Sequence, residues 1–201
     1  NATIAVTGGT TMASVASVMT PFEKDSNYLF VPARGGIGEK MENQANTIVA
    51  QMSRKAQGDY RLLYVPDPIS ETSYQNIIQE PSIIEVLKLI KNADIVLHGI
   101  GDAFTMADRR KTPDELREKL VEKNAVSEAF GYYFDQQGNV VHKVRTVGLQ
   151  LEDLESKEYV VTVAGGKSKA RAIESYFKHG TSNVLITDEA AAEQILRDTS
   201  L

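Results

Sequence analysis

Two glycine-rich segments have the residue types and spacing of a site for an anionic group. The first is Thr7-Gly8-Gly9-Thr10-Thr11, between a predicted strand and a predicted helix. Glycines let a backbone turn tightly and approach a ligand closely. The free N–H groups and positive dipole end of the following helix attract anions. The lysine and the spacing of a Walker loop are absent, so the segment is not a Walker loop. A tight turn with threonine as the helix N-cap would explain the same residues.

The second segment is Ala164-Gly165-Gly166-Lys167-Ser168-Lys169, which also joins a predicted strand to a predicted helix. Lys169 is expected near the start of that helix, within reach of a bound anion. A solvated lysine after a turn explains this segment equally well when it is considered alone. Ligands of open parallel sheets bind at the carboxyl ends of the strands. Two such segments therefore indicate two anionic groups, or one anion with charges on both sides.

Arginines follow two further predicted strands. Arg34 stands before a glycine run, where its planar fork could bind a phosphate through two hydrogen bonds. Arg109 and Arg110, with Lys111, come after His98-Gly99-Ile100-Gly101-Asp102, which has the pattern of a tight strand-to-helix turn. A run of charges is usually a solvated face. Three adjacent cations near the ligand edge of an acidic chain nevertheless make a candidate phosphate clamp.

One carboxylate and the histidines complete the candidates. Glu128 interrupts an apolar stretch, where it could accept hydrogen bonds from sugar hydroxyls or lie at the surface. His98, His142 and His179 share no metal-ligand spacing. The nucleophile motif Gly-x-Ser-x-Gly is absent from the sequence. The sequence therefore predicts neither a metal site nor a bound cofactor.

The elements that must position these residues alternate between strands and helices. Helical spacing of apolar residues begins near Met12, Ala45 and Ala170, and Thr112-Pro113-Asp114-Glu115 has the pattern of a capped helix start. This alternation predicts an α/β, Rossmann-like fold with a mainly parallel sheet and helices on both faces. A β-hairpin at 131–147 is the expected exception. Apolar, β-branched runs typical of strands cover residues 3–6, 28–31, 60–65, 94–97, 140–144, 159–163 and 184–186.

Composition limits the function classes. The chain has 201 residues, which we interpret as one domain over 1–201, and no cysteine, which fits a reducing, cytoplasmic location. No apolar run approaches the roughly 20 residues that span a bilayer. The net charge of −5 makes the chain by itself a poor ligand for nucleic acid. The abrupt apolar start after Asn1 predicts a fragment of a longer protein.

Seven segments of the chain carry a resemblance to a known family: TGGTTMASVASVMTP, LFVPARGGIGE, ENQANTI, RLLYVP, VLHGIGDAFTMADRR, AVSEAFGYYFDQQGNVVHKV and VAGGKSKARAI. With them the chain resembles the effector-binding domains of the SorC/DeoR family of bacterial sugar-responsive repressors. The resemblance covers nearly the whole chain. It implies a fold similar to glucosamine-6-phosphate deaminase and ribose-5-phosphate isomerase. It also implies that the full-length protein binds operator DNA through an N-terminal winged-helix segment absent here, and that fructose-1,6-bisphosphate is the inducer, with other glycolytic phosphates as weaker ligands. We expect the full-length protein to be a homo-oligomer, since operators with repeated half-sites need paired readers.

The family's ligand contacts can be carried over to matching positions of this chain. Most of these positions were already selected by their chemistry, but Gln44 was not, because at a helix start it has the pattern of a capping or surface residue. The sequence does not decide which loop would hold which phosphate. The implied contacts are Gly8, Gly9, Thr10, Thr11, Arg34, Gln44, Arg109, Arg110, Glu128 and Lys169.

Two other functions remain as alternatives. A sugar-phosphate isomerase or deaminase is one, because the Gly-Ile-Gly run at 99–101 is similar to a motif of the deaminases. Those enzymes continue into Asp-Gly-His, whereas this chain continues into Ala103-Phe104-Thr105-Met106, which has no titratable group. Enolisation needs a positioned base, and Glu128 is the candidate left. An oligomerisation module explains the helices but not the glycine segments. We therefore expect a sensor rather than an enzyme.

Overall fold

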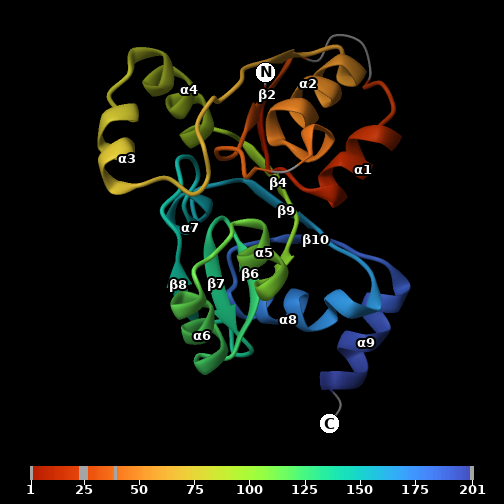
Figure 1. Cartoon of the computed structure of the whole chain (residues 1–201). Helices are drawn as coiled ribbons and strands as arrows, with labels where there is room; N and C mark the ends of the chain where they lie inside the picture. Colours follow the sequence, from red (N-terminus) through yellow and green to blue (C-terminus); the bar gives the residue numbers. More distant parts are fainter. Residues whose placement is uncertain (1, 23–26, 39, 200–201) are drawn as a thin grey trace.

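The centre of the molecule is a six-stranded parallel sheet. The computed structural model describes residues 2–22, 27–38 and 40–199. The strand order is β10-β9-β4-β1-β2-β3, and every neighbouring pair is parallel (Figure 1). The α/β fold with a mainly parallel sheet, predicted from the sequence, is confirmed. The strands are β1 (Ala2–Val6), β2 (Tyr28–Pro32), β3 (Asp59–Tyr60), β4 (Ile95–His98), β9 (Tyr159–Val163) and β10 (Val184–Ile186).

Alternate residues of the central strands face two different helical layers. Val6 and Phe30 pack against α1 and α2, where Met12 and Ile48 are fully buried. Ala5 belongs to the opposite face, in a core that includes residues of α4 and α8. No helix of the described residues is long and apolar enough to span a membrane. The helices named so far are α1 (Thr10–Val18), α2 (Ala45–Ala56), α4 (Pro81–Lys91) and α8 (Ala170–His179). Further helical elements are η1 (Met41–Asn43), α3 (Glu71–Ile77), α7 (Leu151–Leu154), η2 (Lys167–Lys169) and α9 (Glu189–Thr199).

A second, antiparallel sheet lies beside the first, in the lower half of Figure 1. It contains the hairpin that the sequence predicted, closed by a turn in which Asp135 Oδ1 accepts hydrogen bonds from the N–H groups of Gln137 and Asn139. Two further strands that the sequence analysis did not predict extend it to the order β5-β6-β7-β8. The elements are β5 (Gly101–Asp102), α5 (Ala103–Arg109), α6 (Asp114–Glu122), β6 (Ala125–Ala129), β7 (Tyr132–Asp135) and β8 (Val140–Lys143).

Two local predictions were wrong. The strand predicted at 60–65 ends at Tyr60, because the N–H and C=O of Leu63 bond to the side chain of Asn46 instead of a neighbouring strand. The capping box predicted at the start of α6 does not form either: Pro113 occupies the N-cap position. The N–H of Thr112 still bonds to the end of α5, and Glu115 pairs with Lys119 one turn along.

Candidate functional site

The candidate site is a cavity of about 90 Å³ at the carboxyl ends of β1, β2 and β4, the edge where open parallel sheets bind ligands. Residues far apart in sequence meet there. Eight of the ten predicted contacts line the cavity, namely Gly8, Gly9, Thr10, Thr11, Arg34, Arg109, Glu128 and Lys169. The other lining residues are Thr7, Gly99, Ile100, Gly101, Asp102, Thr105, Met106, Ala129 and Phe130.

The first glycine segment brings the start of α1 to the cavity wall. Gly9 is the N-cap residue, with a φ of 112°, and no described side chain caps this helix. Threonine is therefore not the cap. Gly8 passes so close to the start of α2 that an added Cβ would lie 2.8 Å from the carbonyl oxygen of Asn43. The first residues of α1, Thr10 and Thr11, thus present backbone and hydroxyl donors at the positive end of the helix dipole.

The second glycine segment contributes a cation rather than a second set of backbone donors. The N–H of Gly166 donates to Asp188 Oδ2 at 2.6 Å, so a carboxylate of the protein already lies against this loop. The predicted second backbone cradle is therefore not supported. Lys169 does reach the cavity wall, where its Nζ donates to the carbonyl of Ile100 at 3.0 Å. Burial lowers the pKa of Lys169, and the nearby carboxylate of Asp102 only partly offsets this effect.

Glu128 lies deep in the cavity wall, on β6. Its Oε1 accepts hydrogen bonds from Arg34 Nη1 at 3.2 Å, Arg110 Nη2 at 3.1 Å and the N–H of Gly131 at 2.6 Å. Burial alone would raise the pKa of this carboxyl, but the charges of Arg110 and Arg34 outweigh burial and the pKa is lowered. Its other oxygen, Oε2, lies on the side of Gly101, which also lines the cavity. Glu128 is thus an ionised acceptor beside the cavity.

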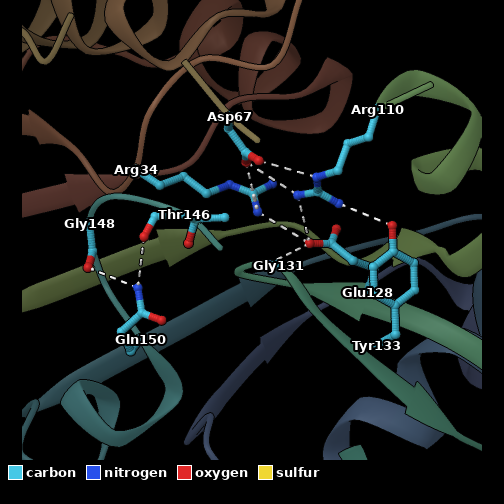
Figure 2. Close-up of polar contacts among 9 residues, drawn as sticks. All are labelled: Arg34, Asp67, Arg110, Glu128, Gly131, Tyr133, Thr146, Gly148 and Gln150. Carbon is cyan, nitrogen blue, oxygen red and sulfur yellow. Dashed lines mark hydrogen bonds and ion pairs between the residues drawn. The ribbon is translucent and has the colours of Figure 1, made fainter. Parts of the chain in front are cut away.

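Two predicted contacts lie outside this cavity. Gln44, the N-cap residue of α2, lines a neighbouring depression that shares Gly8 and Arg34 with the main cavity. The side chain of Arg110 is 1% exposed and lies behind Glu128, where it bonds Asp67 and Tyr133 (Figure 2). Sequence reasoning missed Asp67, because nothing in its local sequence marks it as a partner of two distant arginines.

His98 supports the cavity from inside the core. It is fully buried at the end of β4; its Nδ1 lies 3.0 Å from the carbonyl of Gly99 and its Nε2 lies 2.8 Å from Thr162 Oγ1. A donor at Nδ1 and an acceptor at Nε2 fit the neutral ring. Burial lowers the pKa of His98 to about 4. The neighbouring turn is fixed as well, because Asp102 Oδ1 caps α5 through the N–H groups of Phe104 and Thr105.

The fold and the cavity define an α/β ligand-binding domain, and comparisons with known proteins identify its family. A model of the sugar-binding domain family, Sugar-bind, matches residues 1–197, so the chain belongs to that family. The chain is 58% identical over 196 residues to the central glycolytic genes regulator of Priestia megaterium and 56% identical over 195 residues to that of Bacillus subtilis. These matches cover 98% and 97% of this chain but 57% of each regulator.

A solved structure of a related regulator has the same fold as this chain. The chain superposes on a SorC family transcriptional regulator from Enterococcus faecalis with a TM-score of 0.91 and 54% identity, over 97% of this chain and 80% of that one. The resemblance to the SorC/DeoR family that the sequence indicated is confirmed. The chain spans less than two thirds of the length of the curated relatives it matches.

Proposed function

We propose that this chain is the effector-sensing domain of a transcriptional repressor of glycolytic genes, and that its effector is a phosphorylated sugar, with fructose-1,6-bisphosphate as the preferred ligand. The observation that carries the proposal is the start of α1, which has no side-chain cap among the described residues and opens on a cavity lined by Arg34, Arg109 and Lys169. Two relatives are named central glycolytic genes regulator, which supports a role in the control of glycolytic genes.

One phosphate would bind at the N-terminus of α1. The N–H groups and hydroxyls of Thr10 and Thr11 would donate to its oxygens, and Lys169, which lines the same cavity, would supply a positive charge. Hydrogen bonds to charged groups contribute about 1.5–3 kcal/mol each. A helix N-terminus with cations nearby is a recurrent way to bind phosphate.

The remainder of a sugar bisphosphate would extend over Gly8 and Arg34 toward Gln44. The main cavity, of about 90 Å³, is well below the roughly 300–1,000 Å³ of typical small-molecule sites. The neighbouring depression shares two lining residues with it. Small movements of the side chains between the two would join them, and Glu128 would then accept hydrogen bonds from sugar hydroxyls.

An isomerase or deaminase remains the second candidate, and the chemistry of the site argues against it. A general base works best with a pKa near the working pH. Two arginines lower the pKa of Glu128, which makes this carboxylate a weak base. His98 is fully buried and its pKa is about 4, so it is not presented to a substrate. We therefore propose a site that binds its ligand without turnover.

In the whole protein, operator DNA would be bound by a segment outside this chain. The chain carries a net charge of −5, and nucleic-acid affinity depends mainly on cations that contact phosphates. We further propose a cytoplasmic homo-oligomer, because operators with repeated half-sites need paired readers. Binding of the sugar phosphate would then change the affinity of the oligomer for DNA.

Calorimetric titration with a panel of sugar phosphates, followed by product analysis, tests this proposal. The panel contains fructose-1,6-bisphosphate, fructose-6-phosphate, glucosamine-6-phosphate and ribose-5-phosphate. We expect saturable binding of at least the bisphosphate, and no product from any of them. Turnover that disappears in Glu128→Gln would establish the enzyme instead. Absence of heat and of any melting shift with all four would rule out the sugar-phosphate sensor.

A further inference from the structure

Four charged side chains form a closed, buried cluster that begins in the cavity wall and extends behind it. They are Arg34, Asp67, Arg110 and Glu128, whose side chains are between 0% and 9% exposed. Figure 2 shows the two guanidinium groups lying between the carboxylate of Asp67 and that of Glu128. The cluster holds two positive and two negative charges, so it is neutral as a unit. Buried charges are tolerated only when they are paired and hydrogen-bonded in this way.

Each arginine contacts both carboxylates. Asp67 accepts from Arg110 Nε and Nη2, both at 3.3 Å, and its Oδ2 lies 3.6 Å from Arg34 Nη1. Glu128 Oε1 accepts from both arginines. Tyr133 adds a hydroxyl 3.3 Å from Arg110 Nη1. Each guanidinium is therefore held by both carboxylates, although the four residues lie far apart in the sequence.

The four members divide into two pairs by their access to the cavity. Among the described residues, Arg34 and Glu128 line the cavity, whereas Asp67 and Arg110 do not. An arginine that must be ordered when its ligand arrives loses side-chain entropy, which weakens binding. Asp67 and Arg110 remove that cost in advance, because they hold Arg34 and Glu128 in one arrangement before any ligand is present.

We propose that Asp67 and Arg110 are positioning residues for effector binding, which fix the guanidinium of Arg34 and the carboxylate of Glu128 without touching the ligand. This inference rests on the proposed function, since it concerns the same cavity. It assigns Arg110 a supporting place in the site instead of direct contact with a phosphate. It also adds Asp67, a carboxylate, to the residues on which binding of an anion depends.

The direction in which one substitution changes the Kd of the ligand separates positioning from simple electrostatics. Asp67→Asn keeps the size of the side chain but leaves the buried cluster with a net positive charge. If the cluster acted only through its charge, an anionic ligand would bind more tightly. If Asp67 positions Arg34, the same change lets the guanidinium move and the ligand binds more weakly. The two explanations therefore predict opposite changes in Kd.

The experiment is a calorimetric titration of the folded domain with fructose-1,6-bisphosphate. We expect Asp67→Asn to raise Kd by about tenfold, the loss of roughly one charge-assisted hydrogen bond. Asp108→Asn is the matched control: it makes the same charge change, but Asp108 pairs with Arg117 at the surface and is 60% exposed. Its Kd should stay within about twofold of wild type. Unchanged or tighter binding by a folded Asp67→Asn variant would overturn the proposal.

Arg110→Lys provides a second variant, in case Asp67→Asn does not fold. It keeps the charge but loses the planar fork that bridges two carboxylates. Positioning predicts that Kd rises by about tenfold, whereas a purely electrostatic role predicts an unchanged Kd, which would also overturn the proposal.

A measurement on the free protein separates failure of this inference from failure of the proposed function. NMR of the arginine side chains should show slowly exchanging Nη1 protons for Arg34 in the wild type, because Nη1 contacts both carboxylates, and faster exchange in both variants. If no sugar phosphate binds the wild type, the proposed function is wrong, but the NMR comparison still decides whether Asp67 and Arg110 order Arg34. Equal exchange in all three proteins would refute that ordering.

Discussion

Lowering the pH from 7 to 5 should destabilise this domain through His98. The ring is fully buried and its pKa is about 4, against an ordinary value of 6.5. Between these two values the unfolded chain binds a proton that the folded protein does not, so stability falls as the pH falls. The contribution is complete above pH 6.5. The whole contribution, about 3.4 kcal/mol, is lost only well below pH 4, and about 2 kcal/mol of it is lost by pH 5.

Urea unfolding at pH 7.0 and 5.0, for the wild type and His98→Asn, measures this contribution. The variant cannot titrate at this position, so the difference between the two pH-dependent changes isolates His98. Glu128 does not interfere, because its pKa lies below the ordinary glutamate value and its contribution to stability is lost only at still lower pH. We expect the wild type to lose about 2 kcal/mol more than the variant. A difference below about 0.5 kcal/mol would refute the assignment of a neutral, buried ring.

Three further predictions concern the cavity and its charge. Gly8→Ala should destabilise the domain by about 1–3 kcal/mol and abolish sugar-phosphate binding, because the new Cβ would lie 2.8 Å from a backbone oxygen at the start of α2; an unchanged melting temperature and Kd would contradict the close approach. Lys169→Ala should raise the Kd of the bisphosphate about tenfold with little change in melting temperature, and calorimetry that finds no change would remove Lys169 from the site. The isolated domain should give no gel shift with operator DNA at physiological salt; a salt-sensitive, sequence-specific shift would show that this chain itself reads DNA.

Local sequence pattern was sufficient to predict where several candidate residues lie. The first glycine segment, between an apolar run and a helical spacing, predicted that the start of α1 would meet the ligand edge. Arg34 followed from its place after a strand, and it does line the cavity. These inferences need only the rule that loops at the carboxyl ends of parallel strands lie together.

The other features of the site depend on contacts between residues far apart in the sequence, which the sequence alone did not predict. Asp188 lies 22 positions after Gly166, so the sequence could not show that it bonds the backbone of the second glycine segment. The partners of Asp67 lie at positions 34 and 110. Arg110 and its neighbour Arg109 look alike in the sequence, yet one is buried in the ion cluster and the other lines the cavity. Such differences depend on how α5 packs against β6, which a single sequence does not show.

The central claim is that cations and the start of α1 together select a sugar with two phosphates. Comparison of the calorimetric Kd of fructose-1,6-bisphosphate with that of fructose-6-phosphate tests it most directly. Because a second phosphate would form several charge-assisted hydrogen bonds, the account predicts that the bisphosphate binds about tenfold to a thousandfold more tightly. Arg34→Ala should erase much of this preference, with affinities compared under conditions in which the variant is shown to be folded, because loss of a buried arginine also destabilises the domain. Equal affinities for the two sugars, or an unaltered bisphosphate affinity in Arg34→Ala, would contradict the account.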